Sequence, residues 1–464
     1  MSRLVVVGAG ITGLTAAWAW HRERPDDEVV VLEAGDRVGG KLGRVRLAGT
    51  WYDTGAEAVL ARVPDAVALM AELGLPTVVP ATTSAAVELP TGRHRLPAGT
   101  LLGVPTSSDG LDGVLSPDGV ARVRAEASLQ PLQFPADPAE DRTVGGLLRE
   151  RLGDEVVDRL VEPLLGGVYA GQADRLSVRA TMPALAAQLP RHGTVLAAAA
   201  AARDAGARSR EAAAGTPDGP VFVTLPDGVA GLPHALAAAL PEGAVRLRTP
   251  ASSLRRVAAG FELEVGAGRE VLTADAVLVA VPAGKAARLL AGVAPGAVEP
   301  LEGIPYASMA VVAMAFPGQE LAAGSGLLVP PVTGRLVKGV TVSSQKWPHL
   351  SGDGLLRVRS SVGRYLEEEQ LQRTDADLTA AVVAEVADLL GLSRPEPVET
   401  HLVRWGGGLP QYLAGHLGRV AAVRAAVADV PGLAVAGAAY DGVGVPACIG
   451  SARRAAARLT ATLT

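Results

Sequence analysis

The chain has 464 residues, which is enough to bury a large core and to form two or three domains. Lys and Arg number 43 against 48 Asp and Glu, so the formal net charge of −5 excludes a generally basic protein that binds nucleic acid or an anionic membrane. One cysteine, Cys448, excludes an intrachain disulfide and is typical of a reducing compartment.

The N-terminal segment predicts a dinucleotide-binding βαβ unit. An apolar strand at 4–7 runs into a glycine-rich turn, an Ala-rich helical pattern follows, and a second apolar strand at 28–32 ends at Glu33. The first glycine permits a tight turn, the second admits a pyrophosphate, and the third lets the helix approach the sheet. The phosphate-binding candidates are Gly8, Ala9, Gly10, Ile11, Thr12 and Gly13.

The glycine spacing alone has little weight in this chain. With 55 Gly in 464 residues, G-x-G-x-x-G is expected by chance about 0.8 times. The inference therefore rests on the flanking strands and on Glu33, twenty residues after Gly13, where a carboxylate can accept hydrogen bonds from ribose hydroxyls and would repel a 2′-phosphate. The sequence thus predicts a dinucleotide other than NADP.

Two further glycine segments follow the acid. The stretch 34–41 reads A-G-D-R-V-G-G-K, and its cations are interpreted as partners of a pyrophosphate, with a solvated β-turn as the alternative. The stretch 51–57 reads W-Y-D-T-G-A-E and predicts a strand that enters a glycine turn, followed by a helix at 64–73. Cofactor candidates here are Ala34, Gly40, Lys41, Gly55, Ala56, Glu57 and Ala58.

These motifs together resemble the FAD-binding start of the amine-oxidase/protoporphyrinogen-oxidase superfamily. The resemblance implies that the dinucleotide is FAD. It also implies an α/β fold (α+β overall) with a Rossmann-like FAD-binding domain, a mixed-sheet substrate domain and a helical insertion, as in amine oxidases and p-hydroxybenzoate hydroxylase. The expected FAD-binding domain is discontinuous, at 1–75, 218–290 and 415–464. The expected substrate domain is 76–105 with 291–414, and the mainly helical domain is 106–217.

The middle of the chain carries the most family-specific stretch. Residues 75–135 predict short strands and loops, 141–188 predict helices, and 195–217 predict a helix end with a mobile loop. Residues 160–177, L-V-E-P-L-L-G-G-V-Y-A-G-Q-A-D-R-L-S, are similar to a signature of protoporphyrinogen and coproporphyrinogen oxidases. The resemblance makes Tyr169 a substrate-site candidate, although a tyrosine is more often a core residue.

The later segments return to the cofactor. Strands are expected at 221–225, 245–248, 254–256, 261–265, 274–281, 310–316, 339–344, 355–361, 398–405 and 433–436, and helices at 232–240, 284–290, 375–390 and 449–463. The resemblance places Ala251 beside the adenine. It also places W-G-G-G-L-P-Q-Y at 405–412 near the flavin, with Trp405 as a cofactor candidate and Tyr412 as a substrate-pocket candidate.

The C-terminal glycine motif predicts the second half of the cofactor site. Gly442, Val443 and Gly444 precede the last helix, whose N-terminus is expected to face the flavin. The motif cannot begin a second βαβ unit, because only about twenty residues remain. The sequence around Cys448 lacks the S-G-G-C pattern of covalent flavin attachment, so the FAD is expected to be non-covalent and Cys448 a buried structural thiol.

The sequence shows no separate NAD(P)H fingerprint, no C-x-x-C, no metal-ligand spacing and no nucleophile elbow. The expected enzyme is therefore a flavin oxidase whose cofactor carries the chemistry, with no catalytic side chain identified and no metal. Arg62 and, more weakly, Lys346 are the candidate partners of substrate carboxylates, with a surface cation as the alternative for each.

The resemblance points to the Gram-positive-type coproporphyrinogen III oxidases. It implies oxidation of the porphyrinogen by oxygen in three two-electron steps that release hydrogen peroxide, in haem biosynthesis. Protoporphyrinogen IX as substrate, a flavin amine or carotenoid oxidase, and a non-catalytic FAD-binding carrier are the alternatives. Expected partners are the porphyrinogen, oxygen and transiently the next haem-pathway enzyme, with no nucleic acid.

No apolar run reaches about 18 residues without a charge, Pro or Gly. A motif beginning at residue 8 leaves no room for a signal peptide. The expected location is therefore cytoplasmic, with peripheral membrane association left open.

Overall fold

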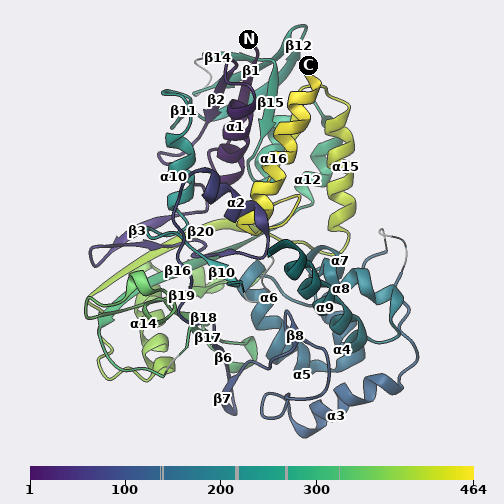
Figure 1. The fold of residues 1–464 in the computed structure, drawn as a ribbon, viewed down its shortest axis with the longest axis vertical. Helices are drawn as coiled ribbons and strands as arrows, with labels where there is room; N and C mark the ends of the chain where they lie inside the picture. The colour runs from purple at the N-terminus through teal and green to yellow at the C-terminus, as the bar shows by residue number, and fades with distance from the viewer. Residues whose placement is uncertain (136, 138–139, 215–218, 267–269, 323, 464) are drawn as a thin grey trace.

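The computed structural model describes residues 1–135, 137, 140–214, 219–266, 270–322 and 324–463. Figure 1 shows a parallel sheet at one end of the molecule, beside both termini, and a larger mixed sheet with a group of helices at the other end. The two ends are joined by long strands, above all β16 (Tyr306–Pro317) and β20 (Glu399–Pro410).

The first sheet has five parallel strands in the order β11-β2-β1-β15-β21. All the side chains of β1 after Arg3 are buried, as expected for a central parallel strand covered on both faces. Strand β1 pairs with segments that are far apart in sequence, because Val5 pairs with Val30 on one side and with Val277 on the other. The strands are β1 (Arg3–Val7), β2 (Glu28–Leu32), β11 (Val245–Arg246), β15 (Ala276–Val279) and β21 (Leu433–Val435).

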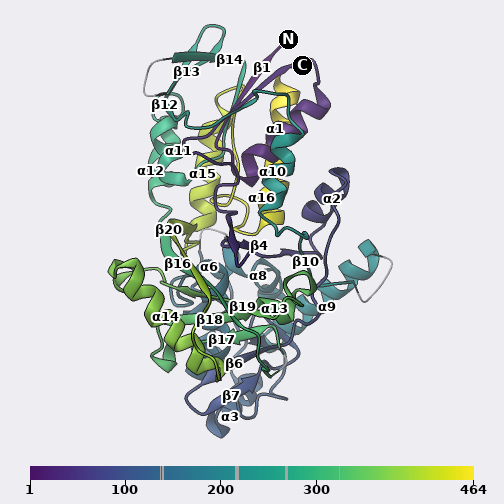
Figure 2. The ribbon, with the colours of Figure 1, turned by 90° about the vertical axis from the view of Figure 1, so that its left-hand side faces the viewer.

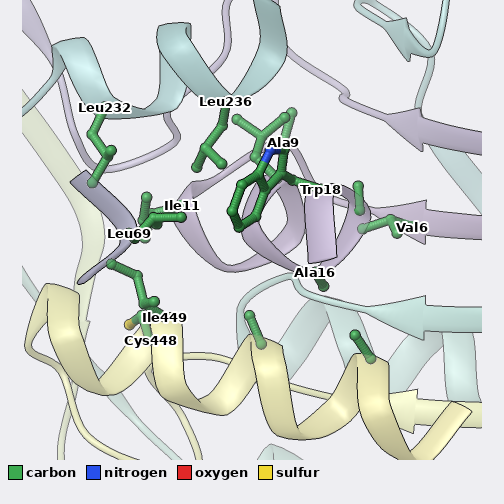
Figure 3. Close-up of a cluster of buried hydrophobic side chains, with 14 of the residues drawn as sticks. Val6, Ala9, Ile11, Ala16, Trp18, Leu69, Leu232, Leu236, Cys448 and Ile449 are labelled. Carbon is green, nitrogen blue, oxygen red and sulfur yellow. The ribbon is translucent and has the colours of Figure 1, made fainter. Parts of the chain in front are cut away.

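One face of this sheet is covered by the first and last long helices. Figure 3 shows their shared core, where Trp18 and Ile11 lie between Leu236 on one side and Ile449 on the other. Small residues such as Ala16 and Ala452 are fully buried and allow the helices to approach closely. These helices are α1 (Ile11–Glu23), α2 (Pro64–Glu72), α10 (Gly231–Ala238) and α16 (Val445–Thr462).

The other face carries an antiparallel three-stranded sheet and three helices. Their common core includes Phe261, Leu290 and Val423, all fully buried. The elements are β12 (Ala251–Val257), β13 (Gly260–Val265), β14 (Glu270–Ala274), α11 (Ala283–Leu290), α12 (Val298–Glu302) and α15 (His416–Ala428).

The second large sheet has seven strands in the order β20-β16-β19-β18-β17-β6-β7, and only the β17–β6 pair is parallel. Helix α14 (Asp375–Leu390) covers one face, where its Leu378, Val382 and Val386 are fully buried. Figure 2 shows α14 and the helical group on opposite sides of these strands. The remaining strands are β6 (Ala85–Leu89), β7 (Gly92–Arg95), β17 (Gly326–Leu328), β18 (Val337–Val342) and β19 (Leu355–Val362).

The helical group occupies residues 117–214 and shares a core with β6. Its helices are α3 (Pro117–Ala125), α4 (Val144–Leu152), α5 (Asp154–Val156), α6 (Glu162–Tyr169), α7 (Val178–Thr181), α8 (Pro183–Gln188) and α9 (Val195–Ala214). A single π-helical turn, Val157–Val161, joins α5 to α6. Short pairs elsewhere are β3 (Arg44–Leu47) with β4 (Thr50–Asp53), β5 (Val59–Leu60) with β10 (Phe222–Val223), and β8 (Thr100–Leu101) with β9 (Val104–Pro105). The short helix α13 is Ser343–Lys346.

Two secondary-structure expectations were wrong. The segment expected to hold only short strands and loops contains α3, whose Ser116 side chain accepts the Gly119 N–H as an N-cap. The segment expected to be a helix end and loop forms α9 up to residue 214, while 215–217 lie outside the described residues. The buried Glu126 carboxylate accepts the first N–H groups of α9, from Val195 and Leu196, and so fixes where the helix starts.

Among the described helices, none is both long and apolar enough to cross a membrane.

Candidate active site

The glycine turn between β1 and α1 has the geometry of a phosphate cradle. The Gly8 N–H donates to the Leu32 carbonyl at 2.7 Å, which ties the turn to the end of β2. A β-carbon on Gly13 would overlap the Gly8 carbonyl oxygen, so this glycine permits the close contact between helix and strand. A β-carbon on Gly10 would meet nothing within 4 Å, so the space above this residue is open. The close helix–strand contact at Gly13 agrees with the sequence interpretation, and pyrophosphate binding at Gly10 stays a prediction.

Glu33 lies beside this turn at the end of β2. Its carboxylate accepts the Ala9 N–H at 2.9 Å and the Gly35 N–H at 2.8 Å. The Glu33 carbonyl accepts the Thr249 N–H at 2.8 Å, which brings the start of β12, at Ala251, close to the acid. The predicted ribose and adenine candidates thus share one corner of the parallel sheet, with Ala34 exposed next to them.

The second glycine segment folds back onto the first. The Gly39 N–H donates to the Ala9 carbonyl at 2.8 Å, and a β-carbon on Gly40 would lie 3.3 Å from the Gly10 Cα. The Lys41 ammonium lies 4.9 Å from the centre of the Tyr306 ring. Burial lowers the pKa of Lys41 to about 8. A partly desolvated cation next to an open glycine turn is suited to an anionic group such as a phosphate.

The turn 55–57 is held by a cluster of partly buried charges, here called the Glu57 cluster: Glu57, Lys346 and Arg359. The Lys346 ammonium lies 2.5 Å from one Glu57 carboxylate oxygen, and the Arg359 Nε lies 3.7 Å from the other. Arg359 also donates to the Gly55 carbonyl at 2.7 Å. Burial alone would raise the pKa of Glu57, but Arg359 and Lys346 hold that pKa below its ordinary value. The flanking Ala56 and Ala58 are half-buried.

Trp405 closes this turn from the other side. Its indole N–H donates to the Thr54 carbonyl at 3.0 Å, and its ring lies 3.1 Å from the β-carbon position of Gly43. A β-carbon on Gly55 would overlap the Lys41 carbonyl oxygen, so the two glycine segments are in backbone contact here. The segments predicted to surround the cofactor are therefore contiguous in space.

The C-terminal motif meets the N-terminal one. A β-carbon on Gly437 would lie 3.4 Å from the Thr12 hydroxyl oxygen, and the α16 N-cap is Gly444. Gly442 has φ +131°, a backbone conformation that favours glycine, with Val443 half-buried beside it. Burial raises the pKa of the Cys448 thiol to about 11. A thiol with that pKa is a poor nucleophile, in keeping with non-covalent cofactor binding.

An aromatic stack connects the signature segment to this motif. The Tyr169 and Tyr412 rings lie 5.6 Å apart, and the Tyr412 ring stacks on His416 at 4.0 Å. The Tyr412 hydroxyl donates to the Ala438 carbonyl, just before the C-terminal glycines. The Gln411 side-chain amide donates to the Tyr169 carbonyl at 2.7 Å. The two aromatic substrate candidates are thus neighbours, next to a predicted flavin-binding segment.

The two cationic substrate candidates have different surroundings. Arg62 is exposed in the short connection between β5 and α2. Lys346 is held in the Glu57 cluster, where its charge already faces a carboxylate. The contacts of Lys346 account for it as part of the protein framework, and substrate binding by either residue stays a prediction.

Two residues of this site had no assigned function in the sequence interpretation. The Asp53 carboxylate is buried and accepts the Val229 N–H at 2.8 Å and the Ala230 N–H at 3.1 Å, while burial raises its pKa to about 7. Asp53 lies in the W-Y-D-T-G-A-E motif, and a carboxylate in an otherwise apolar strand could have identified it as a candidate from the sequence. Arg359 had no such signal, because it is one of several polar residues that alternate along β19.

Comparisons with known proteins cover almost the whole chain. Residues 11–460 match the family described as flavin containing amine oxidoreductases. The coproporphyrinogen III oxidase of Mycobacterium tuberculosis is 38% identical over 97% of this chain and 95% of its own. That of Bacillus subtilis is 30% identical over 97% of this chain and 96% of its own. A crystal structure from Exiguobacterium sp., named provisionally as a protoporphyrinogen oxidase, is 32% identical with a TM-score of 0.84 and covers 100% of this chain and 99% of its own.

Proposed function

This chain belongs to the flavin containing amine oxidoreductase family, and from that premise we propose that it oxidises coproporphyrinogen III to coproporphyrin III in haem biosynthesis. The observation that carries the proposal is the 38% identity to a coproporphyrinogen III oxidase over nearly the full length of both chains. The expected fold class and the resemblance to porphyrinogen oxidases are confirmed, and the chain is a flavin-dependent oxidoreductase.

The residues at the predicted cofactor site fit FAD. The open space at Gly10 and the N-terminus of α1 suit a pyrophosphate, and Glu33, beside this turn, is the proposed partner of the adenosine ribose. The α16 N-terminus and the Gly442–Gly444 segment are the proposed partners of the flavin end. When bound, FAD supplies the hydride acceptor that no side chain of the chain provides.

The contribution of the protein is binding and orientation. Arg359 and Glu57 fix the turn 55–57, and Trp405 anchors the neighbouring Thr54 carbonyl, so that this wall of the proposed site is rigid. Tyr169 and Tyr412 are buried aromatic neighbours, and we propose that they form part of an apolar wall for a large, flat tetrapyrrole. Loss of six electrons and six protons from the porphyrinogen balances reduction of three oxygen molecules to three hydrogen peroxide molecules.

Protoporphyrinogen IX is the second candidate substrate, favoured by the name of the Exiguobacterium protein at 32% identity. It has two propionate groups where coproporphyrinogen III has four. The two candidates therefore differ in the charge that the site must bind.

The test is anaerobic reduction of the bound flavin by each porphyrinogen, followed at the flavin absorbance band, with kcat/KM for both substrates and hydrogen peroxide measured in air. We expect reduction by both and at least a tenfold higher kcat/KM for coproporphyrinogen III. A higher value for protoporphyrinogen IX would establish the second candidate. If neither porphyrinogen reduces the flavin, both proposed activities are refuted. A yield of hydrogen peroxide far below three molecules per porphyrin would refute oxygen as the electron acceptor.

A further inference from the structure

Lys338 is a buried cation without a partner in the described part of the chain. The residue is 5% exposed, and its ammonium makes no hydrogen bond or ion pair with any described residue. Its charged neighbours are Arg364 and Glu367. Arg364 is 7% exposed and lies 3.9 Å from Glu367, which is exposed to solvent. Lys338 and Arg364 are called the cation pair below.

A β-bulge gives Lys338 its direction. Strand β18 pairs with β19 through Val337–Val362 and then Val340–Ser360, so Lys338 and Gly339 together face Ser361. Val337 and Val340 both pack into the core beneath α14. The bulge therefore places Lys338 on the opposite face, the face from which Arg359 reaches the Gly55 carbonyl in the proposed cofactor site.

Arg364 lies on the same side, under the signature helix α6. One terminal nitrogen of its guanidinium donates to the Val329 carbonyl at 3.3 Å, and its Nε has no partner among the described residues. A β-carbon on Gly166 would lie 3.7 Å from that Nε, and the Tyr365 N–H donates to the Ala170 carbonyl at 2.7 Å. The cation pair is thus adjacent to the segment that presents Tyr169.

The carboxylates nearby act on Arg364, which faces Glu367 at 3.9 Å and interacts electrostatically with Glu162, and neither forms an ion pair with Lys338 in the described part of the chain. The buried Glu162 carboxylate accepts the Ala173 N–H at 2.7 Å, and Glu367 accepts from the Gln172 amide at 2.8 Å. Two adjacent buried cations, of which Lys338 has no carboxylate partner among the described residues and Arg364 pairs only with an exposed one at 3.9 Å, are costly to maintain. An ionised carboxylate from a ligand would complete them with charge-assisted hydrogen bonds.

We propose that Lys338 and Arg364 bind a propionate carboxylate of the tetrapyrrole substrate, a placement that rests on the function proposed above. Burial lowers the pKa of Lys338 to about 7 and also lowers that of Arg364, so an arriving anion would stabilise the protonated lysine. The propionate is thereby bound beneath the signature helix, and the ring system extends toward Tyr169 and Tyr412.

The experiment measures equilibrium binding to the FAD-loaded protein by fluorescence quenching, with coproporphyrin III and its carboxylate-free tetramethyl ester in the same detergent buffer. The variants are Lys338→Met and, as a matched control that removes an exposed lysine on α11, Lys285→Met. We expect Lys338→Met to weaken binding of the acid at least tenfold and binding of the ester less than twofold, with Lys285→Met unchanged for both. Equal weakening of acid and ester, or no weakening of the acid, would overturn the assignment.

Two further measurements separate this inference from the function and from the fold. If coproporphyrinogen III does not reduce the wild-type flavin, the proposed function fails. If it does and Lys338→Met binds the acid like wild type, only the carboxylate site fails. Should Lys338→Met not fold, Lys338→Gln replaces it under the same two-ligand criterion.

Discussion

The Glu57 cluster is partly buried and the cation pair is buried, both on one side of the seven-stranded sheet, and the two differ in whether the chain itself supplies a carboxylate for the cations. In the first, Glu57 accepts from Lys346 at 2.5 Å and faces Arg359, so a carboxylate of the chain itself closes the group. In the second, Lys338 has no ion-pair partner among the described residues, and Arg364 donates to the Val329 carbonyl and faces the exposed Glu367 at 3.9 Å. Cations that are paired with a carboxylate of the same chain stabilise the fold. Buried cations that lack such a carboxylate are suited to bind an anionic ligand.

The largest expected effect on stability comes from removing the carboxylate of the Glu57 cluster. Glu57→Gln removes the carboxylate that pairs with both Lys346 and Arg359, whose side chains are 14% and 20% exposed, so we expect the free energy of unfolding to fall by about 3–5 kcal/mol. The measurement is urea denaturation of the FAD-loaded protein.

The matched control for that variant is Glu28→Gln, which breaks an exposed ion pair with Arg3 and should change stability by at most about 1 kcal/mol. Equal effects of the two variants would show that burial gives the Glu57 cluster no special weight.

The glycine turn between β1 and α1 also contains one residue that supports the fold, Gly13, and one that is proposed to bind a ligand, Gly10. Gly13→Ala forces a β-carbon onto the Gly8 carbonyl oxygen, so we expect the FAD-free protein to lose about 1–3 kcal/mol of stability. Gly10→Ala meets nothing within 4 Å, so the FAD-free protein should keep its stability while its affinity for FAD falls. Thermal unfolding without FAD and FAD titration by flavin fluorescence measure the two effects, and a Gly10→Ala protein that binds FAD like wild type would place the pyrophosphate elsewhere.

The elements that the sequence predicted well have local signals. The β1–α1–β2 unit has uninterrupted apolar strands and a glycine turn, and α14 begins at Asp375 and ends at Leu390 as its periodicity predicts. The glycines before the last helix predict that the C-terminal motif completes the cofactor site begun by the first fingerprint, and α1 and α16 do share one core.

The features that it missed depend on distant partners. The start of α9 is fixed by Glu126, whose carboxylate lies 69 residues away in sequence from the Val195 N–H that it accepts. Lys338 looks like a surface residue of a strand, because only the pairing of β18 with β19 reveals the bulge that buries it. Arg359 likewise becomes a site residue only when β19 lies against the turn 55–57.

A smaller change in stability, of opposite sign, is expected when Lys338 of the cation pair is replaced. The pKa of Lys338 is about 7 in the folded protein against an ordinary 10.5, so the unfolded chain binds more protons between these values. Lys338 therefore destabilises the fold most below pH 7, and this cost is relieved as the pH rises toward 10.5. We expect ligand-free Lys338→Met to be more stable than wild type by about 1–2 kcal/mol at pH 6, with a smaller difference at pH 9.

Denaturation of both proteins at the two pH values checks this prediction. Arg364 and Glu367 face Lys338, and both are unchanged in the comparison. A Lys338→Met protein less stable than wild type at pH 6 would mean that the lysine supports the fold.

The smallest effect is expected at Arg62, the exposed cation predicted from the sequence to meet a propionate. An exposed charge pair contributes at most about 1 kcal/mol, so Arg62→Ala should raise the KM for coproporphyrinogen III by about two- to fivefold and leave kcat unchanged. Arg288→Ala, which removes an exposed arginine on α11, is the control. Steady-state kinetics at two salt concentrations sharpen the result, because salt should screen the contribution of Arg62 and should screen that of the buried Lys338 much less. A wild-type KM for Arg62→Ala would refute the propionate role predicted for Arg62.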